Sequence, residues 1–381
     1  MVVVTPLAGK GTLVAKAFQA LAGVKALYTN DNGLRVKANG AIPTLAPGEP
    51  GKGFDVVDEP TDVVAAPPAD RPYGIDLVGA PAAWAQGADG HGLVYGSIDT
   101  GVDVTHESLA NYRGRGADGA LVHDYNFYDP TGKAKAAVDT QAHGSHTIGT
   151  AVGQNGIGVA PKATYISALG LSGNVDSTLR ALQWMLAPTK VDGSAPDPTR
   201  APDVVGMSWW TGSASEDLFQ ESMQDLRAAG IEPVKSAGNN GPGGKSISSP
   251  GQFPELIATA AVDAKGNVAS FSSRGPAPFP AGSTTPKPDF AAPGVDVISS
   301  MPGNKYGKMS GTSMAQPHMS GVILAILSQF PQLTHDQLVD VLKAGAADKG
   351  AAGWDVEYGN GVVNLPASLA AAQRLVDSLA A

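Results

Sequence analysis

The chain has 381 residues and is 43% hydrophobic, which supports a sizeable core, and its length predicts two domains or one large and one small domain. Charged residues make up only 16% and the formal net charge is −9, so the sequence lacks the basic surface that binding to nucleic acid requires. Because there is no cysteine and no apolar run near the roughly 18 residues of a membrane span, we expect no disulfide, no thiolate chemistry and no membrane partner.

Residues 1–58 predict a small α+β unit ahead of the main domain. The Asn32-Gly33 pair stands between two strand-like runs and predicts a β-hairpin. A short amphipathic helix is expected over 12–23, and one more strand is expected over 53–59.

A proline-rich stretch, PTDVVAAPPADRP, begins at Pro60 and predicts a domain boundary. Its four prolines, set among small and acidic residues, disfavour a helix or a central strand. We therefore expect a linker over 59–72 and the main domain over 73–381.

Beyond the linker, apolar runs typical of strands alternate with amphipathic runs typical of helices. The expected strands are LVYGSID (93–99), ATYISALG (163–170), PDVVGMSW (202–209), IEPVKSAG (231–238), ELIATAAV (255–262) and DVISSM (296–301). The expected helices are 175–186, 216–230 and the helix that follows Ser313. This alternation predicts an α/β fold of three layers, in which helices cover both faces of a central, mainly parallel sheet. A capping box of Thr334 and Gln337 predicts the start of one more helix, over 334–345.

In such sheets, functional residues gather where strands end at the carboxyl edge. Asp99 ends the first of these strands, directly before a Thr100-Gly101 turn. An aspartate there either caps the turn or presents a fixed carboxylate for catalysis.

Two histidines, His143 and His146, stand three residues apart at the expected start of a helix. They are typical either of a catalytic base or of a His-x-x-His metal pair. Because no HExxH pattern or other ligand cluster supplies a third ligand, we assign no metal ligands.

Ser313 follows Gly311 at the start of an apolar helix. It is either an N-cap or a nucleophile in the positive field of the helix N-terminus, where backbone N–H groups have no partner within the helix. Asn239 follows a buried-looking strand and Gly238, so its side-chain amide is placed to donate into a cleft. One backbone donor and one amide donor together make an oxyanion hole.

The motifs DTG, HGSHTIGT, SAGN and GTSMAQPH resemble those of the subtilisin-like serine peptidases. Longer stretches, among them YNFYDPTG, FSSRGP and KPDFAAPGVDV, resemble the bacillopeptidase F branch of that family. The likeness runs from about Gly74 to the C-terminal helices. It implies a subtilisin-like fold with Ser313 as nucleophile, His143 as base, Asp99 as the residue that orients the base, and Asn239 in the oxyanion hole.

The resemblance also implies that the substrate backbone pairs with Ser208, Trp209 and Trp210 as an added strand. Trp209 stands where the family has a large residue, whereas Trp210 stands where it has glycine. The Trp210 indole is expected to narrow the primary specificity pocket or cover its neighbour, or else to pack away under a loop. The other expected substrate-binding residues are Ala237, Gly238, Ser248 and Thr312. The Ser249-Pro250 bond is expected to be cis, in a turn that shapes the floor of the primary pocket.

Two departures from the family pattern concern helix residues: Gln316 replaces a serine, and Ile148 with Gly149 replaces a pair of small residues. Trp210 is the third departure, and a separate expectation concerns ions. The loop over 151–163 is shorter than the family's usual calcium loop, so we expect weaker calcium dependence. Catalysis is expected to require no cofactor, while a structural Ca²⁺ stays open, for example at the acidic turn around Asp129.

The sequence therefore predicts a serine endopeptidase that acts on proteins or peptides, and the resemblance suggests a secreted one, although MVVVTPLAGKG lacks the apolar core of a signal peptide. Residues 1–58 are expected to be a propeptide-like remnant that assists folding and inhibits the enzyme. A permanently attached extension is the alternative for this segment. For the whole chain, the alternatives are a catalytically silent binding scaffold and an esterase; the absence of a GxSxG elbow argues against a lipase-type esterase.

Overall fold

The computed structural model describes residues 60–171, 175–210, 218–279 and 282–380, together with the backbone of three N-terminal strands. The predicted hairpin is present, since β2 (Val24–Asn30) pairs antiparallel with β3 (Gly33–Ala38). The two-residue strand β1 (Val3–Val4) adds to the other edge of β3. The helix expected over 12–23 and the strand expected over 53–59 lie outside the described residues.

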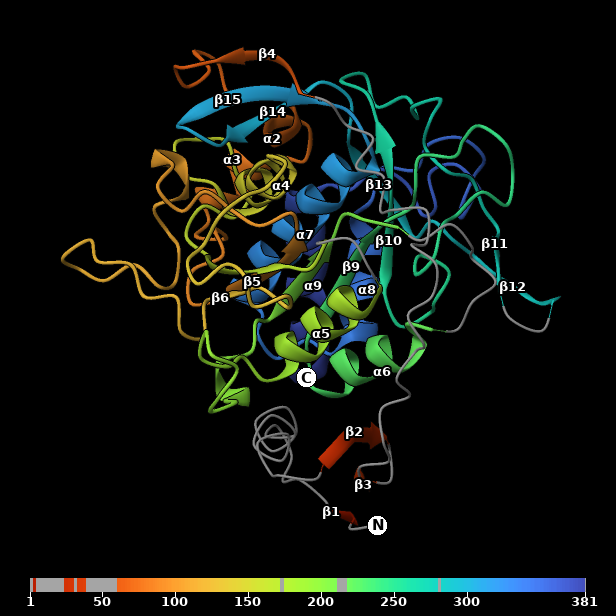
Figure 1. Ribbon diagram of the computed structural model, residues 1–381. Helices are drawn as coiled ribbons and strands as arrows, with labels where there is room; N and C mark the ends of the chain where they lie inside the picture. Colours follow the sequence, from red (N-terminus) through yellow and green to blue (C-terminus); the bar gives the residue numbers. More distant parts are fainter. Residues whose placement is uncertain are drawn as a thin grey trace.

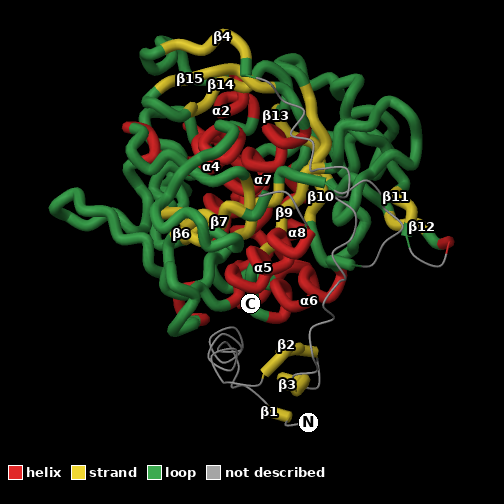
Figure 2. Tube along the Cα trace, in the orientation of Figure 1, coloured by secondary structure: helices red, strands yellow, loops and turns green. Residues whose placement is uncertain are grey.

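A seven-stranded parallel sheet forms the centre of the described main domain (Figures 1 and 2). Its strands are β5 (Val94–Asp99), β6 (Phe127–Tyr128), β7 (Thr164–Leu169), β8 (Val204–Met207), β9 (Glu232–Ser236), β10 (Ile257–Val262) and β13 (Phe290–Pro293). Their order is β13-β10-β9-β8-β5-β7-β6, and each neighbouring pair is parallel. The predicted α/β class and sheet type are confirmed.

Helices cover both faces of this sheet and complete the three layers. Their bounds are α2 (Tyr73–Leu77), α3 (Ala80–Trp84), α4 (His143–Val152), α5 (Val175–Leu186), α6 (Gln220–Ala228), α7 (Thr312–Gln329), α8 (His335–Gly345) and α9 (Leu365–Ala380), with short 3₁₀ helices at Glu107–Leu109 and Pro198–Arg200. Successive residues of a strand point to opposite faces. Val204 accordingly joins the core that includes α4 and α7, while Val205 joins the core that includes α5 and α6. No helix of the described residues is both long enough and apolar enough to cross a membrane.

The predicted capping box at the start of α8 is confirmed. The Thr334 side chain accepts a hydrogen bond from the Gln337 backbone N–H, and the Gln337 side chain accepts one from the Thr334 backbone N–H. Both of these helix-terminal donors are thereby satisfied.

The prediction that DVISSM belongs to the parallel sheet is wrong. That run forms β14 (Val297–Met301), which pairs antiparallel with β15 (Lys305–Met309) in a separate sheet. Only three residues connect the two strands, and so short a connection cannot make the crossover that parallel pairing needs. The parallel strand after β10 is instead the short β13, which the sequence analysis did not predict.

The expected linker over 59–72 contributes one strand to this second sheet. β4 (Thr61–Val64) pairs antiparallel with β15, and all four of its side chains are exposed. It is an edge strand outside the central sheet, where prolines nearby do no harm to pairing. A further two-stranded sheet joins β11 (Ala277–Pro278) to β12 (Thr284–Thr285).

The order of the strands places the site. After β5 the chain passes through α4 to β7 on one side of β5, and then through α5 to β8 on the other side. This change of direction opens a crevice at the carboxyl end of β5, which is where ligands bind in open α/β sheets. Asp99 is the last residue of β5 and lies at that point.

Candidate active site

A buried hydrogen bond joins Asp99 to His143 across the gap between β5 and α4. His143 is the first residue of α4, and its Nδ1 lies 2.7 Å from Asp99 Oδ1. The backbone N–H of Thr100 donates to the same oxygen at 2.7 Å, and Thr147 Oγ1 donates to Asp99 Oδ2 at 3.2 Å. Because a carboxylate only accepts, Nδ1 carries the proton, which makes Nε2 the acceptor of the neutral ring. Asp99 therefore does more than cap a turn.

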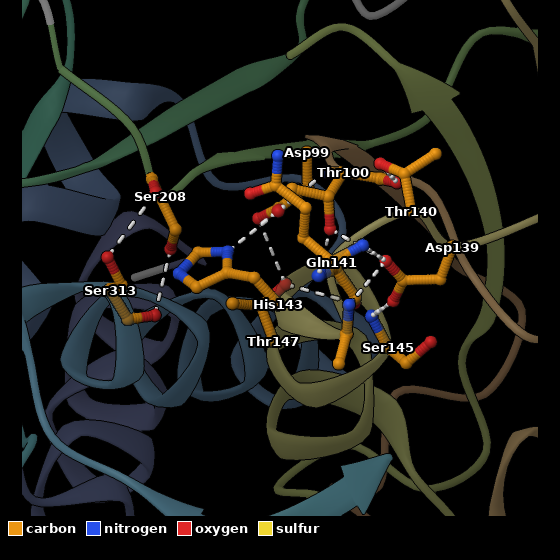
Figure 3. A network of polar contacts seen from close by, with 12 residues as sticks. Asp99, Thr100, Asp139, Thr140, Gln141, His143, Ser145, Thr147, Ser208 and Ser313 are labelled. Carbon is orange, nitrogen blue, oxygen red and sulfur yellow. Dashed lines mark hydrogen bonds and ion pairs between the residues drawn. The ribbon is translucent and has the colours of Figure 1, made fainter. Parts of the chain in front are cut away.

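The start of α4 is held by Asp139, a residue that the sequence analysis did not select. Asp139 Oδ1 accepts from the Ala142 backbone N–H at 2.9 Å and from Thr100 Oγ1 at 2.8 Å, and Oδ2 accepts from the Ser145 backbone N–H at 2.8 Å (Figure 3). These bonds satisfy N–H groups that have no partner within the helix and place a negative charge at its positive end. The sequence signal that could have identified Asp139 is an aspartate just ahead of the start of a helix.

Two glycines allow the end of β5 and the start of α4 to touch. A Cβ on Gly144 would lie 2.1 Å from Gly101 O, and a Cβ on Gly101 would lie 1.9 Å from Val138 O. Gly101 also has a φ of 104°, in the left-handed region. This close approach sets the distance between the Asp99 carboxylate and the His143 ring.

Ser313 is the second residue of α7, and its side chain does not cap the helix, so the N-cap alternative is wrong. The N-cap position is Gly311. Ser313 Oγ instead donates to the carbonyl oxygen of Ser208 at 3.3 Å. In Figure 3 the imidazole of His143 extends from Asp99 toward Ser313 and Ser208, so the Asp99 carboxylate, the His143 ring and the Ser313 hydroxyl lie in one row.

Ser208 is itself fixed against α7. Its Oγ lies 2.8 Å from both Ser313 O and Gln316 Oε1, and Gln316 Nε2 donates to Ser320 Oγ at 2.6 Å. Gln316 thus replaces the expected serine with a longer side chain that anchors Ser208. The residue whose carbonyl accepts from the Ser313 hydroxyl is thus anchored to α7 through its own side chain.

The amide of Asn239 has a fixed orientation. Its Oδ1 accepts from the Thr312 backbone N–H at 2.9 Å and from Thr312 Oγ1 at 2.8 Å. Thr312 Oγ1 in turn accepts from the Gly238 backbone N–H at 3.1 Å. With the oxygen bound to the start of α7, the Nδ2 donors of Asn239 point away from Thr312.

The expected substrate-binding tryptophans differ in their surroundings. Trp209 is 3% exposed and packs in the core against Phe219, with ring centroids 5.3 Å apart. Trp210 is half-buried at the end of a described segment. Of the two indoles, that of Trp210 is therefore the more exposed.

The remaining expected residues lie together beside Asn239. The Ser248 backbone N–H donates to Ala237 O at 3.1 Å, and a Cβ on Gly238 would lie 2.4 Å from Ser248 Oγ. The Ser249-Pro250 bond is cis, as predicted.

His146 and His143 do not form a metal pair. His146 Nε2 donates to Val297 O at 3.0 Å and lies 3.1 Å from Gly307 O, and burial lowers the pKa of His146 to about 3. It is a neutral core residue, while His143 is bound to Asp99. Among the described residues, no group of three or more His, Cys, Asp or Glu side chains is placed to hold a metal ion. The Asp129 carboxylate accepts from Thr131 and Ala134 within its own turn.

Comparison with known proteins agrees with this geometry. Residues 90–361 match the Subtilase family. The chain is 40% identical over 290 residues to Bacillopeptidase F of Bacillus subtilis (strain 168), covering 72% of this chain and 20% of that protein. It is 32% identical over 303 residues to Subtilisin DY of Bacillus licheniformis, covering 78% of this chain and 98% of that protein. It is 31% identical over 267 residues to the Major intracellular serine protease of Bacillus subtilis (strain 168), covering 68% of this chain and 76% of that protein. The chain thus spans about a fifth of the first relative and most of the other two.

Asp139→Ala removes the carboxylate that caps α4 from outside. We expect the free energy of unfolding to fall by about 1 kcal/mol, the usual cost of losing a helix cap, as measured by urea denaturation. The matched control is Asp70→Ala, which alters an exposed aspartate and should change stability by less than about 0.5 kcal/mol. Equal stabilities for the two variants would contradict the capping role.

Proposed function

The chain belongs to the subtilase family, and on this premise we propose that it is a serine endopeptidase that hydrolyses peptide bonds through an acyl-enzyme on Ser313. The observation that carries the proposal is the 2.7 Å bond between His143 Nδ1 and Asp99, on a ring that extends toward Ser313. A base oriented by a carboxylate and facing a serine at a helix start is the arrangement that nucleophilic catalysis needs.

In the proposed reaction, His143 Nε2 accepts the proton of Ser313 Oγ as the oxygen attacks the substrate carbonyl. Asp99 keeps the ring in this tautomer and stabilises the imidazolium without taking the proton. The imidazolium then protonates the leaving amine, and the C–N bond breaks to leave an ester on Ser313. His143 then takes a proton from a water molecule as the water oxygen attacks the ester, and it passes that proton to Ser313 Oγ as the ester C–O bond breaks, which releases the acid and restores the serine.

The negative oxygen of the tetrahedral intermediate needs donors that are already in place. We assign this role to Asn239 Nδ2 and to the Ser313 backbone N–H at the start of α7. The support is the orientation of the amide, which Thr312 fixes through Asn239 Oδ1. Because the donors are fixed before the reaction, little reorganisation is required when charge develops.

The proposed substrate is a protein or peptide whose backbone pairs with Ser208–Trp210. β8 ends at Met207, so this segment leaves the sheet beside Ser313 with a backbone available for an added strand. The opposite wall of the primary pocket is assigned to Ala237, Gly238 and Ser248.

The N-terminal segment is proposed to be an internal partner, acting as chaperone and inhibitor. Its described strands form a sheet separate from that of the main domain, and β2 lies within contact distance of α6. A segment that packs on the outer helices can guide their folding before it is removed. A permanent extension is the alternative, and secretion stays a prediction from the family resemblance.

We propose further that catalysis needs no metal, and that any structural Ca²⁺ contributes little stability. A catalytically silent scaffold is the alternative for the whole chain. Against it, the residues at all four chemical positions, Asp99, His143, Asn239 and Ser313, are of the competent type and in compatible geometry.

Ser313→Ala and His143→Ala are each expected to abolish peptide hydrolysis, because one removes the nucleophile and the other its base. Cleavage of a fluorogenic peptide gives the rate, and circular dichroism checks that the fold persists. Activity above a few per cent in either variant would contradict the triad.

The parent protein should keep both activity and thermal stability in excess EDTA. A large loss of thermal stability with EDTA would contradict the calcium proposal.

Incubation of the purified chain should produce a new N-terminus between Asp58 and Tyr73, read by N-terminal sequencing, together with a rise in activity. The Ser313→Ala chain is the control and should stay uncut if the enzyme processes itself. A chain that is fully active while intact would favour the permanent extension.

Trp210→Gly should raise kcat/KM for a substrate with Phe before the scissile bond relative to its Ala counterpart. Pocket contacts of this size contribute roughly 1–3 kcal/mol, so we expect a change in the Phe-to-Ala ratio of about tenfold or more. Trp354→Gly, at a half-buried tryptophan bonded to Pro288, is the control. An unchanged ratio in Trp210→Gly means that this indole does not set specificity.

A further inference from the structure

Lys235 is a buried lysine at the carboxyl end of β9 that the proposed reaction does not use. Its side chain is fully buried. Its Nζ donates to Ser236 O at 2.8 Å and to Ser236 Oγ at 2.6 Å, and both acceptors are neutral. Among the described residues, no carboxylate forms an ion pair with it.

This arrangement is incomplete for an ammonium group. A lysine has three N–H donors, and Ser236 takes only two of them. A cation removed from water without a counter-charge is costly, and burial accordingly lowers the pKa of Lys235 well below its usual value. An anion that reached Nζ would satisfy the third donor and favour the charged form.

The side-chain nitrogen of Lys235 lies between Trp209, on the segment after β8, and Ser236, at the end of β9. Lys235 pairs with Met207 in the parallel register of β8 and β9. Its Nζ lies 5.8 Å from the ring centroid of Trp209, on the segment that includes Ser208. Its bonding partner Ser236 lies on the segment that leads to Asn239.

The same group also lies next to the expected floor of the primary pocket. A Cβ on Gly251 would lie 3.6 Å from the Ser236 carbonyl oxygen that Lys235 binds. Gly251 directly follows the cis Ser249-Pro250 bond, in the turn assigned to that floor. The turn assigned to the pocket floor therefore lies against the Ser236 carbonyl that Lys235 binds.

We propose that Lys235 is a specificity residue that recognises the carboxylate of an Asp or Glu side chain immediately before the scissile bond. The inference rests on the proposed peptidase function. Lys235 is sealed from solvent in the free chain, so the entering side chain must displace what covers it. The carboxylate then accepts the third hydrogen bond of Nζ and favours the charged form of Lys235, for which the described residues supply no carboxylate partner.

The test compares two peptides that differ only in Glu or Gln before the scissile bond, cut by the full chain. Gln is the neutral match for Glu in size, so the ratio of their kcat/KM values reports charge alone. We expect the parent protein to favour Glu by about tenfold or more, and Lys235→Met to lower that ratio by at least the same factor. Lys343→Met, at an exposed lysine of α8, is the control and should keep the parent ratio.

The outcomes separate this inference from the one on which it rests. Cleavage of neither peptide, nor of any other, would overturn the proposed function itself. If both peptides are cut and the Glu-to-Gln ratio of kcat/KM is near one or below one, the role of Lys235 is overturned, while the proposed peptidase function stands. This result needs only the parent protein, so it holds even if Lys235→Met fails to fold. An equal drop of the ratio in Lys343→Met would also count against the role.

Discussion

The close approach of the end of β5 to the start of α4 is the constraint on which the rest of the site depends. Two glycines permit it, and Asp139 fixes it by bonding α4 to the turn after β5. Only then does the His143 ring meet the Asp99 carboxylate at 2.7 Å with its other nitrogen toward Ser313. The sheet supplies the crevice, but this contact decides whether the crevice contains an oriented base.

Much of the fold and of the row formed by Asp99, His143 and Ser313 could be predicted from the sequence, because the signals are local. Apolar runs marked the strands, a capping box marked α8, and the Asn-Gly pair marked the hairpin. The turn residues after β5 and the glycine before Asn239 likewise pointed to the carboxyl edge of the sheet. In each case the information lies within a few residues of the feature it specifies.

The features that were missed depend on contacts between distant segments. DVISSM reads as a buried strand, but its pairing is set by a short connection to β15 that forces an antiparallel hairpin. Asp139 has no motif of its own and gains its role only where α4 meets Thr100. Lys235 stands within an apolar run, and its position between Trp209 and Ser236 becomes visible only once β8 and β9 are side by side.

We propose above all that His143 activates Ser313 for attack on an electrophile. The most direct measurement is labelling of the intact chain with a fluorophosphonate, followed by mass mapping of the modified peptide, for the parent and for His143→Ala. We expect a single modified site, on the peptide that contains Ser313, and its loss in the variant. No labelling of the parent, labelling of another serine, or equal labelling without His143 would contradict the account.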